Sequence, residues 1–573
     1  MSIRAAQSAA LSALQTSQAG ISVSSENIAN ASVEGYTAKS LSLSSSVTTG
    51  ASTGVTVTSV GSTVDSYLLK SISEAASESG YASVFSDPLN MVASQFGDVG
   101  DDGSISTLIA DLETSIAALA VSADSQSEKS TTLSEANAIA DELNNLSQSV
   151  QDQRASADQS IEDTVDQIND LLNEIHAYNN QLSGTDGTTL ATSELEDARA
   201  QAINELSELV DISYYTDSSN TTQIYIGGTL VVGSQVQELS YNAVGTVTSD
   251  TTFADITVNG NSITDSISGG SLGGLIELRD ETLPDIQEEL DNLATTLMDS
   301  INAVTNLGTA YPAPSELVGS EEVDLTDAFS GTGTVRLAAT DEDGNAVEVI
   351  EIDLSTITTV QDLVDAINSS TYLDASVGSD GTLEIAASDD DYGVSIINMD
   401  ASVGADDQGF SDYFGLNDMF TGTDAGNISV NSAWLDDTSR LPVGSGSDDA
   451  TLAVGDSVIS SGSSDVAEAL ADLFDDNVSF DAAGNLGSTK TTLSDYAAEI
   501  LSDVAQQASS AETETSVATS AYEELVESFS NQYGVNTDEE ALTLSNLQSA
   551  YEAAAAILEI TQSLMDTLLE AVS

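Results

Sequence analysis

The last part of the chain, DEEALTLSNLQSAYEAAAAILEITQSLMDTLLEAV at residues 538–572, carries the most regular apolar pattern in the sequence. Apolar residues recur there at alternating steps of three and four, which is the spacing of a coiled-coil seam. The positions in step are Leu544, Leu547, Tyr551, Ala554, Leu558, Thr561, Met565, Leu568 and Val572. The pattern predicts one long helix, and a helix with a single apolar stripe needs a packing partner in water.

A weaker stripe of the same kind lies at the other end of the chain. Small and aliphatic side chains recur over residues 3–28 near steps of three, four and seven, and Ser17 and Ser25 interrupt them. We predict that the two terminal helices pair as an α-helical coiled coil, with each other or with a neighbouring copy. The predicted subunit-interface residues are Ile3, Ala10, Leu14, Ile21, Ile28, Leu544, Leu547, Tyr551, Ala554, Leu558, Met565 and Leu568.

Between the ends, long helical patterns alternate with short β-type runs. The helical patterns cover about 131–183, 193–210, 272–305 and 488–530. Within the first, Val150 and Ile161 are eleven residues apart, which indicates a stutter in a long helix pair. Pro284 marks a kink or a first-turn position in the third.

The β-type runs fall in two places. Residues 212–262 contain short strand-like segments between Gly, Asn, Asp and Ser turns. Residues 311–440 suggest a β-hairpin, a short helix and a further strand, which is typical of a small α+β insert. The sequence therefore predicts a mainly α, multidomain protein with β-rich insertions.

Charge and composition exclude several classes of function. The 573 residues include 10 basic and 94 acidic side chains, a net charge of −84. A general nucleic-acid binder needs clustered Lys and Arg, and anionic membranes also repel such a chain. The first 70 residues, however, carry three basic and three acidic side chains and no net charge. This neutral segment is the part of the chain that we expect to be buried.

Nothing in the sequence points to catalysis or to a bound metal. The chain has no cysteine and one histidine, His176, so thiolate and multi-histidine metal sites are excluded. Ser271 sits in a G-x-S-x-G pattern, but no histidine follows it and a hydroxyl without a base is a weak nucleophile. The stretches at 98–103 and 341–345 fail the calcium-loop pattern. We predict no enzyme activity, no cofactor, and no catalytic or metal-binding residues.

Two short motifs resemble those of the bacterial flagellar axial proteins, which include rod, hook and hook-associated proteins. The segment from Asn27 to Tyr36 is similar to the N-x-x-N-x-x-T-P-G-Y signature of that family, with Val33 and Glu34 in place of Thr and Pro. Residues 534–540, followed by Gln548, resemble the G-V-N-x-D-E-E segment of its hook-associated branch. The motif residues are Asn27, Asn30, Gly35, Tyr36, Gly534, Val535, Asn536, Asp538, Glu539, Glu540 and Gln548.

The resemblance implies an architecture. It places the chain ends in an inner polymerisation domain, surrounds it with a mostly helical second domain, and projects the insert outward. The corresponding ranges are 1–36 with 535–573 for the terminal domain, 37–310 with 441–534 for the second domain, and 311–440 for the outer insert.

The resemblance also implies a role outside the cell, as a structural component that joins the flagellar hook to the filament. The implied partners are further copies of the chain, hook protein, hook-associated protein 3, and a cytoplasmic export chaperone on the C-terminal helix. The stretch at the N-terminus lacks the features of a secretory signal, and the family is exported through the flagellar type III apparatus. The alternatives are another axial protein, such as a hook or rod protein, or an acidic extracellular calcium-binding adhesin or S-layer-like protein.

Two residue-level expectations follow. Residues 30–36 form the turn that leaves the first helix, with Gly35 at a positive φ that a β-carbon would strain. The acids at 538–540 follow Asn536 at a helix start, where we expect them to interact with the helix dipole.

Overall fold

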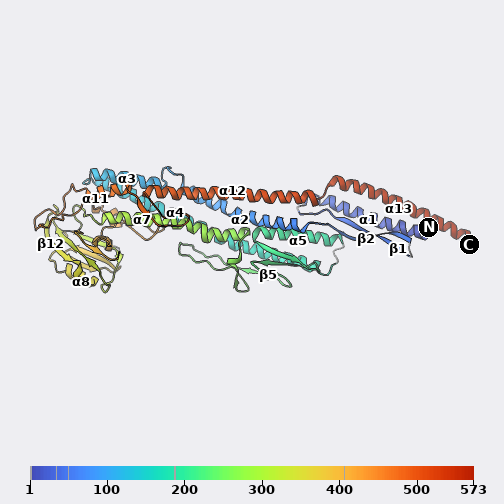
Figure 1. Ribbon diagram of the computed structural model, residues 1–573, viewed down its shortest axis with the longest axis horizontal. Coiled ribbons are helices and arrows are strands. Elements are labelled where there is room, and N and C mark those ends of the chain that lie inside the picture. The colour runs from blue at the N-terminus through green and yellow to red at the C-terminus, as the bar shows by residue number, and fades with distance from the viewer. Residues whose placement is uncertain (1–2, 34, 49–50, 186–188, 406, 573) are drawn as a thin grey trace.

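The computed structural model describes every residue except 1–2, 34, 49–50, 186–188, 406 and 573 (Figure 1). The molecule is elongated, with both termini at one end and a compact β-rich part at the other. Helices form most of it and the sheets are small, so the predicted mainly α class with β-rich insertions is confirmed.

The end that holds the termini contains two long helices and one hairpin. Helix α1 (Ile3–Ala29) lies beside α13 (Thr537–Val572) (Figure 1). Strands β1 (Ser40–Thr48) and β2 (Ala51–Gly61) form an antiparallel hairpin, and β2 lies against α1.

Eight further helices build the elongated body around one continuous apolar core. In it α12 lies along α2, and α4 packs on α3, α5, α6 and α7. Helix α4 is a single helix of 57 residues. The eight are α2 (Ser66–Phe96), α3 (Ile105–Val121), α4 (Gln126–Leu182), α5 (Leu190–Leu209), α6 (Gly270–Glu277), α7 (Leu283–Thr305), α11 (Asp465–Asp475) and α12 (Leu493–Tyr533).

The eleven-residue step in α4 holds a buried polar cluster in place of apolar side chains. Asp158 is fully buried and accepts a 2.8 Å hydrogen bond from Nη1 of Arg279, which is itself 2% exposed. Tyr241 donates to the same carboxylate, and the ring of Phe253 lies 4.1 Å from the Arg279 guanidinium carbon. Arg279 lies in the π-helix Leu278–Thr282, between α6 and the first turn of α7 with its Pro284. The stutter thus coincides with an ion pair that sequence periodicity did not reveal.

Small sheets flank the body, and several short elements connect its parts. One sheet has the order β3–β4–β5 and another β6–β7–β8. These strands are β3 (Ile212–Thr216), β4 (Thr222–Ile226), β5 (Thr229–Val232), β6 (Leu239–Ser240), β7 (Thr257–Val258) and β8 (Asn261–Ser262). Further short elements are β17 (Phe420–Thr421), β18 (Ser429–Val430), α10 (Ser432–Asp436), β19 (Val478–Phe480) and β20 (Thr489–Thr491).

The distal β-rich part has its own core, which runs from Leu317 to Leu416. Two three-stranded sheets, β12–β11–β15 and β13–β14–β9, enclose helix α8. Nη1 of Arg336 on β11 donates a 2.9 Å hydrogen bond to the carbonyl of Ser447. The segment around Ser447 therefore also contacts the distal part. Its elements are β9 (Glu316–Glu322), β10 (Gly331–Thr332), β11 (Thr334–Thr340), β12 (Ala346–Asp353), α8 (Val360–Ile367), β13 (Leu373–Val377), β14 (Thr382–Ala387), β15 (Gly393–Ile397), β16 (Ser402–Val403) and α9 (Phe410–Phe414).

The few basic side chains are mostly inside the protein. Six of the ten are buried, and they pair with carboxylates or donate to backbone and amide oxygens. These six are Lys39, Lys129, Arg154, Arg199, Arg279 and Arg336. The surface is therefore almost entirely acidic, and dissolved salt must screen its self-repulsion.

Glu289 on α7 is a buried acidic side chain without an ion-pair partner among the described residues. Glu289 is 0% exposed. Its Oε1 accepts a 3.1 Å hydrogen bond from the Asn485 amide, and its Oε2 has no hydrogen-bond partner among the described residues. Burial, reinforced by the charges of Asp503 and Asp285, raises the pKa of Glu289 from 4.5 to about 8.

Glu289 is therefore expected to make the protein less stable as pH rises. Between pH 4.5 and 8 the unfolded chain loses a proton that the folded chain keeps, so the free energy of unfolding falls across that window. Glu289→Gln is expected to flatten this slope and to raise the free energy of unfolding at pH 8 by about 1–3 kcal/mol. Urea titrations at pH 5 and pH 8 measure both effects; equal slopes in the two proteins would contradict the assignment.

Among the described residues, none of the helices combines the length and the apolar character of a membrane span. In the same part of the chain, no three or more His, Cys, Asp or Glu side chains are grouped so that they could hold a metal ion.

Candidate assembly interface at the paired termini

The two terminal helices approach each other closely because α1 presents small side chains to α13. A β-carbon at Gly20 would lie 2.8 Å from Cδ1 of Leu547, so only glycine fits this close approach without a shift. Ser17 is 5% exposed. The prediction that a serine interrupts the stripe is wrong for Ser17, because the contact admits a small side chain there, whereas Ser25 is exposed. The buried positions of α1 are Ala10, Ser17, Gly20, Val23, Ser24 and Asn27.

Within one chain, the predicted interface residues are covered to very different extents. Ala10 and Ala554 are buried, at 4% exposure each. Tyr551 and Leu568 are exposed, at 40% and 52%. The half-buried members are Ile3, Leu14, Ile21, Ile28, Leu544, Leu547, Leu558 and Met565. Pairing within the chain thus leaves part of the predicted seam open to solvent.

Helix α13 also carries a second apolar stripe, most of which lies outside the predicted seam. Its members are 48–65% exposed, although they are large and aliphatic. We call this set the outer stripe, and it consists of Leu542, Ile557, Ile560, Leu564 and Leu568, the last of which also belongs to the predicted seam. This stripe is visible in the sequence, because Ile557, Ile560, Leu564 and Leu568 follow one another at steps of three and four. The prediction used only the more regular seam beside it.

Asn27, the first motif residue, joins three separate segments. Its amide nitrogen donates to the carbonyl of Lys39 at 2.9 Å and to Oε1 of Glu540 on α13 at 2.7 Å. Its amide oxygen accepts from the Lys39 amide and from the Tyr36 hydroxyl, each at 3.0 Å. All four hydrogen-bonding positions of this side chain are used, and Asn27 is fully buried. The asparagine thus fixes α1, the chain leaving it, and α13 together.

The same turn is anchored to the helical body by a buried ion pair. Nζ of Lys39 lies 2.5 Å from Oδ2 of Asp197 on α5, and the lysine side chain is 0% exposed. The hydroxyl and amide of Thr37 also donate to this carboxylate, each at 2.9 Å. Burial, assisted by Glu194 and Asp197, raises the pKa of Tyr36 to about 12. Tyr36 therefore remains a hydrogen-bond donor to Asn27 at physiological pH.

The remaining motif residues lie around this turn. Gly35 has φ +73°, so the expected positive φ is confirmed. The Val33 amide donates to the Asn30 carbonyl at 2.9 Å, and Glu34 lies outside the described residues. Gln548 is exposed on α13, and Val535 is half-buried just before it.

The three acidic residues at the start of α13, Asp538, Glu539 and Glu540, make different contacts. Oδ1 of Asn536 accepts from the amides of Asp538 and Glu539, at 3.1 and 3.3 Å, which caps the helix. Gly534, before it, closes the last turn of α12 by donating to the Ser530 carbonyl. Glu540 departs from the expected dipole role, because its carboxylate holds Asn27 instead.

The residues that resembled catalytic ones are placed as follows. Ser271 lies on α6, with its hydroxyl 3.5 Å from the Leu209 carbonyl. His176 lies mid-helix in α4 and is half-buried rather than solvated, with Nδ1 shielded from solvent. Neither belongs to the terminal interface.

Family models match three parts of the chain. Residues 89–314 match the flagellar hook-associated protein FlgK helical domain, 334–389 the flagellin hook IN motif, and 8–37 the flagella basal body rod protein. The last of these covers most of α1 and the Asn27–Tyr36 turn. The first covers most of the elongated body.

Whole-chain relatives are also found. Flagellar hook-associated protein 1 of Salmonella typhimurium is 25% identical over 98% of both chains. That of Escherichia coli K12 is 23% identical, again over 98% of both chains. A solved structure of the flagellar hook junction protein FlgK from Burkholderia pseudomallei is similar with a TM-score of 0.47 and 17% identity, over 80% of this chain and 98% of that one. The family models and the full-length relatives agree that this chain is similar, along almost its whole length, to flagellar hook-associated protein 1.

Proposed function

We propose that this protein is a structural component of the bacterial flagellum that joins hook to filament and polymerises through its terminal helices. The observation that carries the proposal is the paired terminus. Helices α1 and α13 cover one face of each other and are locked by Asn27 and Glu540. The outer stripe of α13 nevertheless remains exposed. A long apolar stripe on a soluble surface marks an interaction site, and here further copies of the chain would cover it.

The proposed partners follow from this position in the flagellum. Copies of the chain would form a ring or helical layer, with hook protein on one side and hook-associated protein 3 on the other. Before export, a cytoplasmic chaperone would cover the apolar stripes of α13. The assembled protein is extracellular, and its role is mechanical rather than enzymatic.

Each part of the chain has its own proposed role in the junction. Residues 1–36 and 535–573 form the polymerisation domain. Residues 37–310 and 441–534 form the rigid body around it, and residues 311–440 form the outer insert. Asn27 joins the two parts by hydrogen bonds to the Lys39 backbone, and the Lys39–Asp197 ion pair fixes this same residue to α5 at 2.5 Å, so load can pass from the terminal helices to the body.

Deletion of the gene tests the junction role. Cells without the protein are expected to carry hooks without filaments and to release monomeric flagellin into the medium. Electron microscopy of the cells and gel analysis of the medium measure these outcomes, and a plasmid copy of the gene is the control. Absent hooks would indicate a hook or rod protein instead, and normal filaments would contradict the proposal.

A further inference from the structure

The sheet next to α2 leaves one strand edge open. In the order β3–β4–β5, strand β3 pairs on one side only. Soluble proteins usually protect such an edge with charged residues or proline. The sequence of β3, Ile-Ser-Tyr-Tyr-Thr, contains neither. Of the four edge strands of the two distal three-stranded sheets, β9, β12 and β13 carry acids, and β15 has no charge but is buried along its whole length.

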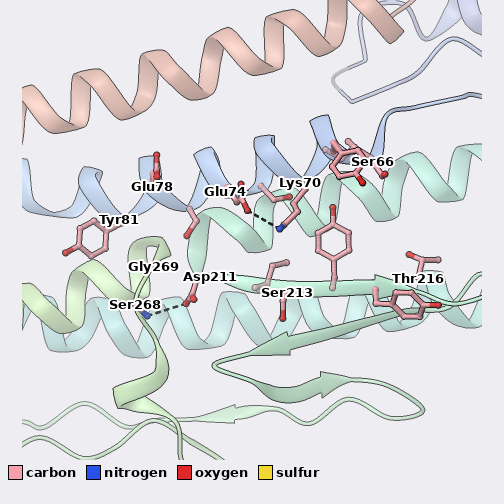
Figure 2. Close-up of a pocket in the computed structure, with 17 residues that line it drawn as sticks. Ser66, Lys70, Glu74, Glu78, Tyr81, Asp211, Ser213, Thr216, Ser268 and Gly269 are labelled. Carbon is pink, nitrogen blue, oxygen red and sulfur yellow. Dashed lines mark hydrogen bonds and ion pairs between the residues drawn. The ribbon is translucent and has the colours of Figure 1, made fainter.

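The open edge faces a long groove, and α2 forms its opposite wall (Figure 2). The groove has a volume of about 1090 Å³ and runs along residues 66–81 and 211–216. This volume reaches the upper limit of small-molecule pockets and suits a chain segment better. Two large aromatic side chains on its walls are exposed, Tyr67 at 81% and Tyr215 at 64%. The geometry favours an extended strand that adds to β3.

The charges along the groove restrict what can enter it. Glu74, Glu78 and Asp211 lie on its walls, and the single cation, Lys70, pairs with Glu74 at 3.4 Å. An acidic segment would be repelled, and the chain carries 94 acidic side chains. Residues 40–64, which include the hairpin β1–β2, are the longest stretch of the chain without a charged residue.

The hairpin has the complementary features. Strand β1 pairs only with β2, so its outer edge is also open. Leu43, Val55 and Val57 on the hairpin are 36–52% exposed. The hairpin does not occupy the groove of its own chain, because it packs against α1 and lies closer to the chain termini than the sheet that holds β3 (Figure 1).

We propose that in the assembled junction β1 of one copy adds as a strand to β3 of a neighbouring copy, in the groove between α2 and β3. The neighbour is therefore displaced along the long axis of the molecule. Backbone hydrogen bonds between the two edges supply the affinity, and Leu43 and Tyr215 supply side-chain contact across the new pair. This inference rests on the proposed polymerisation, and it adds a second contact between copies, away from the terminal helices.

Cysteine cross-linking tests the pairing directly, because the natural chain has no cysteine. Leu43→Cys and Tyr215→Cys chains are produced together in cells that lack the natural gene. Their isolated flagella are treated with a short bis-maleimide linker, which tolerates a small error in register. A linked dimer is expected only when both variants are present.

The matched control replaces Tyr215→Cys by Val454→Cys, a residue that is 71% exposed near the distal part of the chain. This pair is expected to give no dimer. Normal filaments without the mixed 43–215 dimer, or dimers from Leu43→Cys alone, would overturn the strand pairing and leave the junction role intact. Filaments that persist in cells without the gene would instead contradict the junction role.

Discussion

Replacing Asp158 with alanine is expected to lower the free energy of unfolding of the helical body by about 3–5 kcal/mol. The substitution removes the fully buried anion beside the Arg279 guanidinium, which is 2% exposed and retains Asp280 as its second anion. The Tyr241 hydroxyl and the Val244 amide lose the same acceptor. The cost of the change is that of the donors on Arg279, Tyr241 and Val244 that are left without this acceptor inside the protein. Urea unfolding followed by far-ultraviolet circular dichroism measures it.

Two control variants separate the loss of a buried ion pair from the loss of an exposed one. Glu74→Ala breaks the exposed Lys70–Glu74 pair and is expected to cost no more than about 1 kcal/mol. A double variant, Asp158→Leu with Arg279→Met, removes both charges and is expected to recover most of the lost stability. A loss below about 1 kcal/mol for Asp158→Ala would show that Arg279 is compensated by another group.

Placing acids on the outer stripe of α13 is expected to abolish filament attachment while leaving the single chain folded. Ile560 and Leu564 are 60% and 51% exposed, so Ile560→Asp with Leu564→Asp removes little packing within one copy. Between copies, each carboxylate would be buried without a partner. That costs about 3 kcal/mol or more per contact, a factor of about 100 in affinity.

Electron microscopy of the cells and thermal melting of the purified protein separate the two effects. The expected result is bare hooks together with an unchanged melting temperature. Leu558→Asp is a useful comparison, because Leu558 is half-buried in the single chain and its loss should affect both measurements. Val454→Asp, at a 71% exposed site, is the neutral control. Normal filaments in the double variant would show that another face of the protein forms the contact between copies.

The sequence by itself determined the features that repeat locally. The steps of three and four at the C-terminus predicted α13, the eleven-residue step predicted one long α4, and the composition predicted an acidic, cysteine-free protein. The motifs around Asn27 and Asn536 pointed to the family. Periodicity succeeds at this level because a helix repeats its environment every 3.6 residues, so one buried face leaves a readable pattern.

Only the tertiary structure decided which distant residues meet. Asn27 and Glu540 are 513 positions apart, and Lys39 and Asp197 are 158 apart. Asp158 and Arg279 lie in segments that carry no sign of each other in the sequence. A polar side chain at a break in an apolar stripe looks the same whether it faces solvent or a buried partner. Its burial depends on packing between elements, which local spacing does not encode, and the function of the paired termini depends on those contacts.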